Sequence, residues 1–119
     1  MTSIYFLLPS EHVSHFHRIK SDELWFFHEG SPLTVHTLDE NGHHEHLVGL
    51  DITANQTPQF LVPANTIFGS SVNEKGSYSL VSCVVAPGFD FRDFELFNTE
   101  DLLKDYPDYE AIIRKMTIS

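Results

Sequence analysis

The sequence predicts one mostly β domain, a barrel or sandwich of short strands that ends in a helical tail. Its 119 residues suit a single average domain and are too few for two independent cores. Before Pro87 the chain consists of short runs rich in Phe, Val, Ile, Thr and Tyr, separated by turn residues, which is typical of β barrels and sandwiches. After Thr99 the apolar residues follow helical spacing instead. We therefore expect a single domain over residues 1–119, with strands over about 2–86 and the tail over about 99–116.

Six or seven strands are expected before Pro87. They are Thr2–Leu8, Phe16–Lys20, Leu24–Glu29, Leu33–Leu38, His44–Leu50, Gln59–Val62 and Tyr78–Ala86. Between the fourth and the fifth, Asn41 and Gly42 supply two residues that readily adopt positive φ, the strongest short-range signal for a hairpin. We therefore predict a tight hairpin turn at these two positions.

The tail is predicted to contain two short helices. Thr99 can cap a helix that begins at Glu100, and Asp108 can cap a second one over Tyr109–Lys115. Because the second helix has an apolar side, we expect the tail to pack on the barrel.

Charge and hydropathy exclude two classes of partner. The chain carries 17 acidic against 7 basic residues, a net charge of −10, which would repel a nucleic-acid backbone. No apolar run approaches the roughly 20 residues that span a bilayer. The amino terminus lacks the basic region and cleavage site of a signal peptide, so we expect a soluble cytoplasmic protein. The single cysteine, Cys83, lies in an apolar run and is predicted to act as a small core hydrophobe.

The most informative stretch is 15–30. Residues two apart in a strand share a face, so His15 and His17 are expected to project together. If the chain then turns into the next strand, Glu23 can return to the same interior face, with Trp25 and Phe27 following at strand spacing. Imidazole, carboxylate and aromatic groups would then line one pocket.

This pattern resembles the first motif of the cupin superfamily, in which two histidines one residue apart are followed by a glutamate and, seven residues later, a glycine. Glu23 and Gly30 have that spacing, whereas the interval from His17 to Glu23 is one residue longer than in metal-binding members. The second cupin motif resembles residues 63–68. There Asn65 replaces a glycine and Phe68 replaces the histidine that would ligate a metal.

A closer resemblance, to an uncharacterised cupin family, covers nearly the whole chain. It is carried by four runs, which include SDELW at 21–25 and VAPGFDF at 85–91; the others are 3–8 and 59–64. The resemblance implies a double-stranded β-helix, or jelly roll, that dimerises, with a fold similar to dTDP-4-dehydrorhamnose 3,5-epimerases and seed storage proteins. It implies no particular reaction. Family members usually begin with a segment containing His-Pro-Glu-Gly-Gly, which does not occur in this sequence, so pocket residues from it are not carried over.

Three interpretations of the pocket residues remain open. His15, His17 and Glu23 are weak metal candidates, because Phe68 cannot supply a fourth ligand; a divalent metal, if bound, would be held loosely. Alternatively, His17 and Glu23 form an acid/base pair with protonation perturbed by an apolar pocket. In the third, Glu23 is a structural partner of a cation such as Lys20 or Arg18.

Two functions follow from these interpretations. The first is binding of a small polar molecule, such as a sugar-like one, in the barrel. The residues expected to bind it are His17, Glu23, Trp25, Phe27, Gln59 and Phe68. The alternative is an enzyme, either a metal-free isomerase or epimerase with His17 and Glu23 as catalytic residues, or a weakly metal-dependent lyase or oxygenase. A homodimer is expected from the family resemblance and from 10 Phe, 4 Tyr and 1 Trp, which is more aromatic surface than one small core easily hides.

Two further groups of residues have simpler interpretations. The run His43-His44-Glu45-His46 could suggest a metal site, but it follows a predicted turn, where polar residues are usually just solvated. The aromatic residues near the end of the sheet, Phe89, Phe91, Phe94 and Phe97, are predicted to pin a connecting segment to the barrel wall or an interface.

Overall fold

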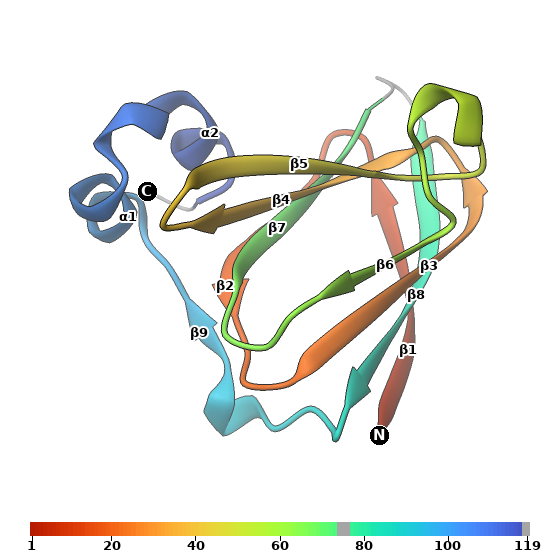
Figure 1. Ribbon diagram of the computed structural model, residues 1–119, viewed down its shortest axis with the longest axis horizontal. Helices are drawn as coiled ribbons and strands as arrows, with labels where there is room; N and C mark the ends of the chain where they lie inside the picture. Colours follow the sequence, from red (N-terminus) through yellow and green to blue (C-terminus); the bar gives the residue numbers. More distant parts are fainter. Residues whose placement is uncertain (74–76, 118–119) are drawn as a thin grey trace.

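Two antiparallel sheets face one another in the computed structural model, which describes residues 1–73 and 77–117 (Figure 1). One sheet has the strand order β1-β8-β3-β6 and the other β5-β4-β7-β2-β9. The strands are β1 (Thr2–Pro9), β2 (Val13–Arg18), β3 (Asp22–Gly30), β4 (Leu33–Asp39), β5 (Gly42–Val48), β6 (Gln59–Val62), β7 (Ile67–Val72), β8 (Tyr78–Ala86) and β9 (Glu95–Leu96). The predicted mostly β fold with a helical tail is confirmed.

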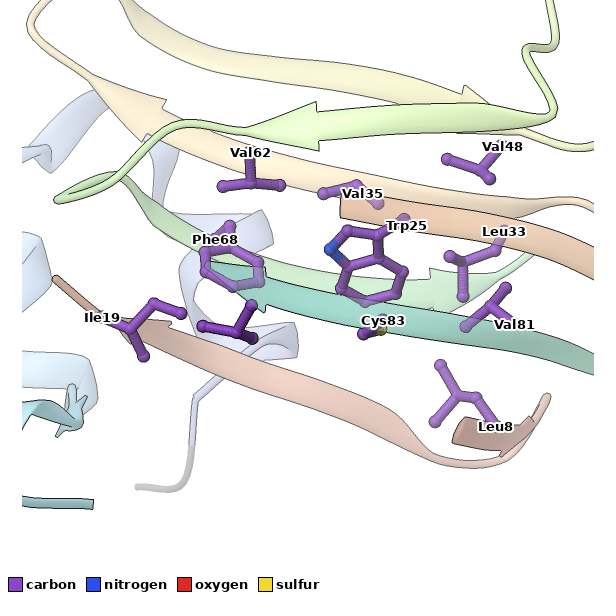
Figure 2. Packing of buried hydrophobic residues seen from close by; sticks show 11 residues of the cluster. Leu8, Ile19, Trp25, Leu33, Val35, Val48, Val62, Phe68, Val81 and Cys83 are labelled. Carbon is purple, nitrogen blue, oxygen red and sulfur yellow. The ribbon is translucent and has the colours of Figure 1, made fainter. Parts of the chain in front are cut away.

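The main core lies between the two sheets (Figure 2). Trp25 of β3 and Phe68 of β7 lie at its centre with their rings edge to face, 6.3 Å apart. Around them pack the side chains of Leu8, Ile19, Leu33, Val35, Val48, Val62, Val81, Cys83 and Val85. Alternation along β8 places Cys83 in this core, as the sequence predicts, while the residues on either side point outward.

The helical tail covers the outer face of the five-stranded sheet (Figure 1). It consists of α1 (Thr99–Asp105) and α2 (Glu110–Lys115), which the turn η3 (Pro107–Tyr109) connects. A second apolar cluster, formed by Phe16, Leu38, Ile67, Leu102, Ile113 and Met116, joins the helices to the sheet. The caps differ from the predicted ones: Asn98 caps α1 by accepting from the Asp101 amide at 2.8 Å, and Asp108 lies within η3. None of the described helices is long and apolar enough to cross a membrane.

The strand β7 was not predicted, although it lies in the middle of its sheet. Its sequence contains Gly69-Ser70-Ser71, which weakens the β signal. Glycine is needed there because a Cβ at position 69 would lie 2.5 Å from the Ser14 carbonyl oxygen and 2.9 Å from the Met116 side chain. The two-residue strand β9 was also missed.

The hairpin between β4 and β5 forms, but one residue away from the predicted turn. Asp39 pairs with Gly42, so the loop is Glu40-Asn41. Gly42 has φ +108°, whereas Asn41 does not have the positive φ that the sequence predicted. The Asp39 carboxylate accepts a hydrogen bond from the Asn41 amide at 2.8 Å, which stabilises this alternative turn.

Candidate functional site

A cavity of about 330 Å³ opens between the sheets at the end where β1 begins. Strands β1, β2, β3 and β8 and the segment after β8 form its walls. Its lining residues are Thr2, Ile4, Phe6, Ser14, His17, Glu23, Trp25, Cys83, Val85 and Phe89. The walls are mostly apolar, with few polar groups, as is usual for a small-molecule site.

Glu23 supplies the acidic group of this cavity. It pairs with Val62 of β6 on one side and Val85 of β8 on the other, and strand alternation places Trp25 beside it on the same face. Burial raises the pKa of the Glu23 carboxyl to about 7, although the nearby Cys83 thiol and Trp25 indole favour its charged form. The carboxyl can therefore both donate and accept a proton near neutral pH.

The two cations that could have neutralised Glu23 pair with other residues. Arg18 donates to both carboxylate oxygens of Glu95, at 3.2 and 3.0 Å. The Lys20 ammonium lies 3.9 Å from Asp93. The structural interpretation of Glu23 as a partner of Arg18 or Lys20 is therefore wrong.

His17 supplies the basic group. Its Nδ1 lies 2.7 Å from the His15 carbonyl oxygen, and because a carbonyl only accepts, Nδ1 must carry the proton. Burial lowers the pKa of His17 below its ordinary value, so the ring is neutral at pH 7. Nε2 is then unprotonated. The ring is held between Phe68 and Phe94, with centroids 4.2 and 5.3 Å away.

A bulge in β2 separates His15 from His17. Pairing with β7 changes register between Ser14 and His17, so these two residues, three apart, both line the cavity. His15 does not line it and contributes its carbonyl group to the site. The expectation that both histidines project together rested on unbroken alternation and is wrong for that reason.

The structure places the other predicted binding residues away from the cavity wall. Gln59 is exposed and pairs with Phe26. Its side chain therefore lies on the outer face of the sheet, whereas Trp25 lies on the inner face. Phe27 packs against the main core. Phe68 supports the site from behind by contacting the rings of His17 and Trp25.

Several lining residues were not predicted. Phe89 comes from the segment after β8, which was expected only to pin a connection. Phe94, from the same segment, does not line the cavity but stacks on His17 behind it. Ser14 reaches the cavity through the bulge, and the β1 residues Ile4 and Phe6 line it because β1 pairs with β8. Among these residues, only Ile4 and Phe6 had a signal in the sequence, because their two-residue spacing in β1 places them on one face.

A second group of ionisable residues lies on the β4–β5 hairpin. His36 of β4 is buried, with 4% of its surface exposed, and its Nδ1 lies 3.0 Å from Nε2 of His43. Burial, followed by the charge of His43, lowers the pKa of His36 to about 4. His44 pairs with Asp39 at 3.1 Å, and His46 stacks on Phe60. The histidines at 43, 44 and 46 are thus partly buried with partners, not simply solvated.

The family described as "Cupin superfamily (DUF985)" matches residues 1–97. The chain belongs to this family. A protein from Shewanella oneidensis has 50% sequence identity and a TM-score of 0.92 over 98% of this chain and 73% of its own. A hypothetical protein from Leishmania major has 42% identity and a TM-score of 0.91 over 99% of this chain and 76% of its own. Among curated proteins, none matches the sequence.

The cupin jelly roll is shared with more distant proteins. RmlC from Streptococcus suis, determined in complex with dTDP-D-xylose, has 12% identity and a TM-score of 0.63 over 92% of this chain and 58% of its own. A likeness at this identity shows the fold alone.

The structure accounts for both positions at which the sequence was expected to depart from the second cupin motif. Asn65, which stands where the motif has glycine, adopts φ +64°, a conformation that asparagine tolerates better than most residues. Phe68, which stands where the motif has a ligand histidine, packs on His17 instead.

Cupins can bind a metal in the barrel, but the residues of this barrel do not fit one. His15 does not line the cavity, and Phe68 offers no ligand atom, so only His17 and Glu23 of the expected ligands remain there. Within residues 1–73 and 77–117, the group of three donors close enough for one ion is His36, His43 and Glu45, outside the barrel. We derive no barrel chemistry through a metal.

Proposed function

We propose that this cupin binds a small polar molecule, of the size of a monosaccharide, in the cavity between its sheets. The observation that carries the proposal is the buried Glu23 carboxyl, which lies at the cavity wall without a cation. A buried ionisable group with no counter-ion destabilises the fold, so it persists where a ligand uses it. The cavity volume of about 330 Å³ lies at the lower end of the range for small-molecule sites.

Trp25 adds a second polar group at the cavity wall. Its buried indole N–H interacts with the Glu23 carboxyl and favours the charged form of that group. A donor of this kind in a mostly apolar cavity can also bind an acceptor group of a ligand. Glu23, Trp25 and His17 together offer one acid, one donor and one acceptor.

A thermal-shift and native mass-spectrometry screen tests the proposal. The probes are a panel of monosaccharides and dTDP-sugars; the RmlC complex supports the choice of sugar-like compounds only through the shared fold. We expect at least one probe to raise the melting temperature of the wild type. Glu23→Gln should lose this rise, whereas Glu11→Gln, at an exposed glutamate in the turn after β1, should keep it. Equal stabilisation of all three proteins would contradict a role for Glu23.

A metal-free isomerase or epimerase is the second candidate, favoured by the tautomer of His17. Unprotonated Nε2 can remove a proton from carbon next to a carbonyl, while a protonated Glu23 donates its proton to the carbonyl oxygen. Return of the proton from His17 to carbon, and of a hydroxyl proton of the enol to Glu23, completes the isomerisation, restores both residues and needs no co-reactant. NMR detection of solvent deuterium entering a bound probe would support catalysis; binding without exchange would leave the binding function alone.

We also propose that the protein forms a homodimer through the outer face of the four-stranded sheet. Unlike the other sheet, this one has no helices on its outer face among the described residues (Figure 1). Large apolar side chains are exposed there: Tyr5 at 78%, Leu7 at 58% and Leu61 at 46%. Exposed apolar side chains on an uncovered sheet face favour association. Light scattering of the wild type should show a dimer, and Leu61→Glu should dissociate it. The control Ile52→Glu changes an exposed residue of η1 (Ile52–Ala54) and should leave the dimer intact. A wild-type monomer at micromolar concentration would contradict this.

A further inference from the structure

Three metal-binding side chains meet on the outer face of the five-stranded sheet, away from the ligand cavity. His36 comes from β4, and His43 and Glu45 come from β5. One donor atom of each lies within 4.8 Å of the other two. The closest pair, Nδ1 of His36 and Nε2 of His43, is 3.0 Å apart.

The register of the β4–β5 hairpin creates this arrangement. His36 pairs directly with Glu45, and Leu38 pairs with His43, so His43 is the diagonal neighbour of His36 on the same face. The strand period of two excludes His44 from that face, and it instead pairs with Asp39. The site therefore depends on specific positions and not on the density of histidines.

Burial and hydrogen bonding fix His36 in an orientation that suits a ligand. Only 4% of its surface is exposed, and its Nε2 lies 2.9 Å from the hydroxyl oxygen of Ser71 on β7. In this orientation Nδ1 is directed at His43, and Nε2–H can donate to Ser71. A metal-ligating histidine typically donates its other ring N–H to such a partner, which fixes its tautomer.

We propose that His36, His43 and Glu45 form a binding site for a divalent transition metal, with zinc the expected ion. Two imidazoles and one carboxylate, with a fourth position for water, are a ligand set that zinc accepts. Metal–nitrogen bonds of about 2.0–2.1 Å in a tetrahedral shell require donors about 3.3 Å apart. The two imidazole nitrogens need to separate by only a few tenths of an ångström, and the exposed Glu45 side chain can close on the ion.

The competing explanation is an ordinary hydrogen bond between two neutral imidazoles. That explanation accounts for the contact between His36 and His43 but assigns nothing to Glu45. Lys115 of α2 carries a positive charge that acts on His36, which should weaken the affinity for a cation without blocking it, because its side chain is exposed. Metal binding and its dependence on Glu45 distinguish the two explanations.

Zinc affinity of the purified full chain, measured by competition with a chromophoric chelator, tests the proposal. We expect His43→Gln and Glu45→Gln each to weaken zinc binding at least tenfold. His44→Gln is the matched control, because it removes a neighbouring histidine from the opposite face, and it should bind within about twofold of the wild type. The cobalt-loaded wild type should show the intense visible absorption of tetrahedral cobalt. Circular dichroism of each variant checks that the fold is retained.

Failure of this site is separable from failure of the proposed function. Glu23→Gln and His17→Gln should leave zinc affinity unchanged, since the cavity lies between the sheets and the metal donors lie outside. Absence of zinc binding by the wild type would overturn the proposal. Equal loss of affinity in His44→Gln would overturn it too, by showing adventitious binding to a histidine-rich hairpin.

Discussion

The Nδ1 atom of His17 lies 2.7 Å from the carbonyl oxygen of His15, so a residue expected to share the site through its side chain instead acts through its backbone. This hydrogen bond fixes the tautomer of His17 and leaves Nε2 as an acceptor. Burial of the same ring lowers its pKa.

The tautomer of His17 is directly measurable. We expect long-range ¹H–¹⁵N spectra to show a protonated Nδ1 and an unprotonated Nε2 at pH 7, with a titration midpoint below the ordinary value of 6.5. Solvent-exposed His12 serves as the internal control. An Nε2–H tautomer, or a midpoint above 6.5, would remove the proposed acceptor from the site.

Phe89 is expected to contact the ligand. Phe89→Ala should weaken binding of any stabilising probe about tenfold, because it removes an aromatic wall of the cavity. Phe91 is the matched control: it packs against Phe89 at 6.5 Å but does not line the cavity, so Phe91→Ala should retain affinity. Isothermal titration calorimetry measures both. Loss of affinity in Phe91→Ala alone would place the binding surface elsewhere.

Gly69 should tolerate no side chain. In Gly69→Ala the added Cβ would meet the Ser14 carbonyl oxygen at 2.5 Å, so we expect a loss of about 3 kcal/mol in the free energy of unfolding. Gly88→Ala, where the nearest atoms lie 3.6 Å from an added Cβ, should change it by less than about 1 kcal/mol. Urea denaturation compares the two. Similar losses in the two variants would show that the close contacts at position 69 do not set the requirement for glycine there.

The ion pair of Arg18 should be independent of the cavity. Arg18→Gln breaks the paired hydrogen bonds to Glu95, but both side chains are partly exposed, so the cost should be about 1 kcal/mol or less. The pKa of Glu23, followed by ¹³C NMR, should stay at about 7. If it rises clearly in Arg18→Gln, Arg18 stabilises the Glu23 carboxylate after all.

Simple alternation predicted the fold well where strands are regular. The positions of β6 and β8 match the predicted bounds, and the two-residue spacing of Glu23 and Trp25 correctly placed them on one face. The bulge in β2 was unpredictable because register is set by pairing with β7, a strand that its glycine and serines concealed. The register of the β4–β5 hairpin was also not predictable from one strand alone. A turn at Asn41-Gly42 would have paired His36 with Leu47, whereas the observed turn pairs it with Glu45.

The long-range parts of the site had no local signal. Phe89 reaches the cavity from a segment with no regular strand or helix, and its place depends on how the chain leaves β8. Gln59 lies on the outer face because it pairs with Phe26 and not with a residue of the Glu23 face. Such assignments require the register between strands, which composition and spacing within one strand do not contain.

The stability of Glu23→Gln as a function of pH tests the central claim, that Glu23 is a buried carboxyl without a counter-ion. A pKa of about 7, against the ordinary 4.5, means that the folded state retains a proton which the unfolded chain releases. The free energy of unfolding of the wild type should therefore fall by about 3 kcal/mol, relative to Glu23→Gln, as the pH rises from 4.5 through 7. The control Glu11→Gln should show no such difference.

Denaturant unfolding at pH 4.5 and pH 8 gives this difference for all three proteins. We predict that Glu23→Gln is close to the wild type at pH 4.5 and more stable than it at pH 8. A Glu23→Gln protein that is less stable than the wild type at pH 8 would contradict the account, because it would show that the charged carboxylate holds the fold together.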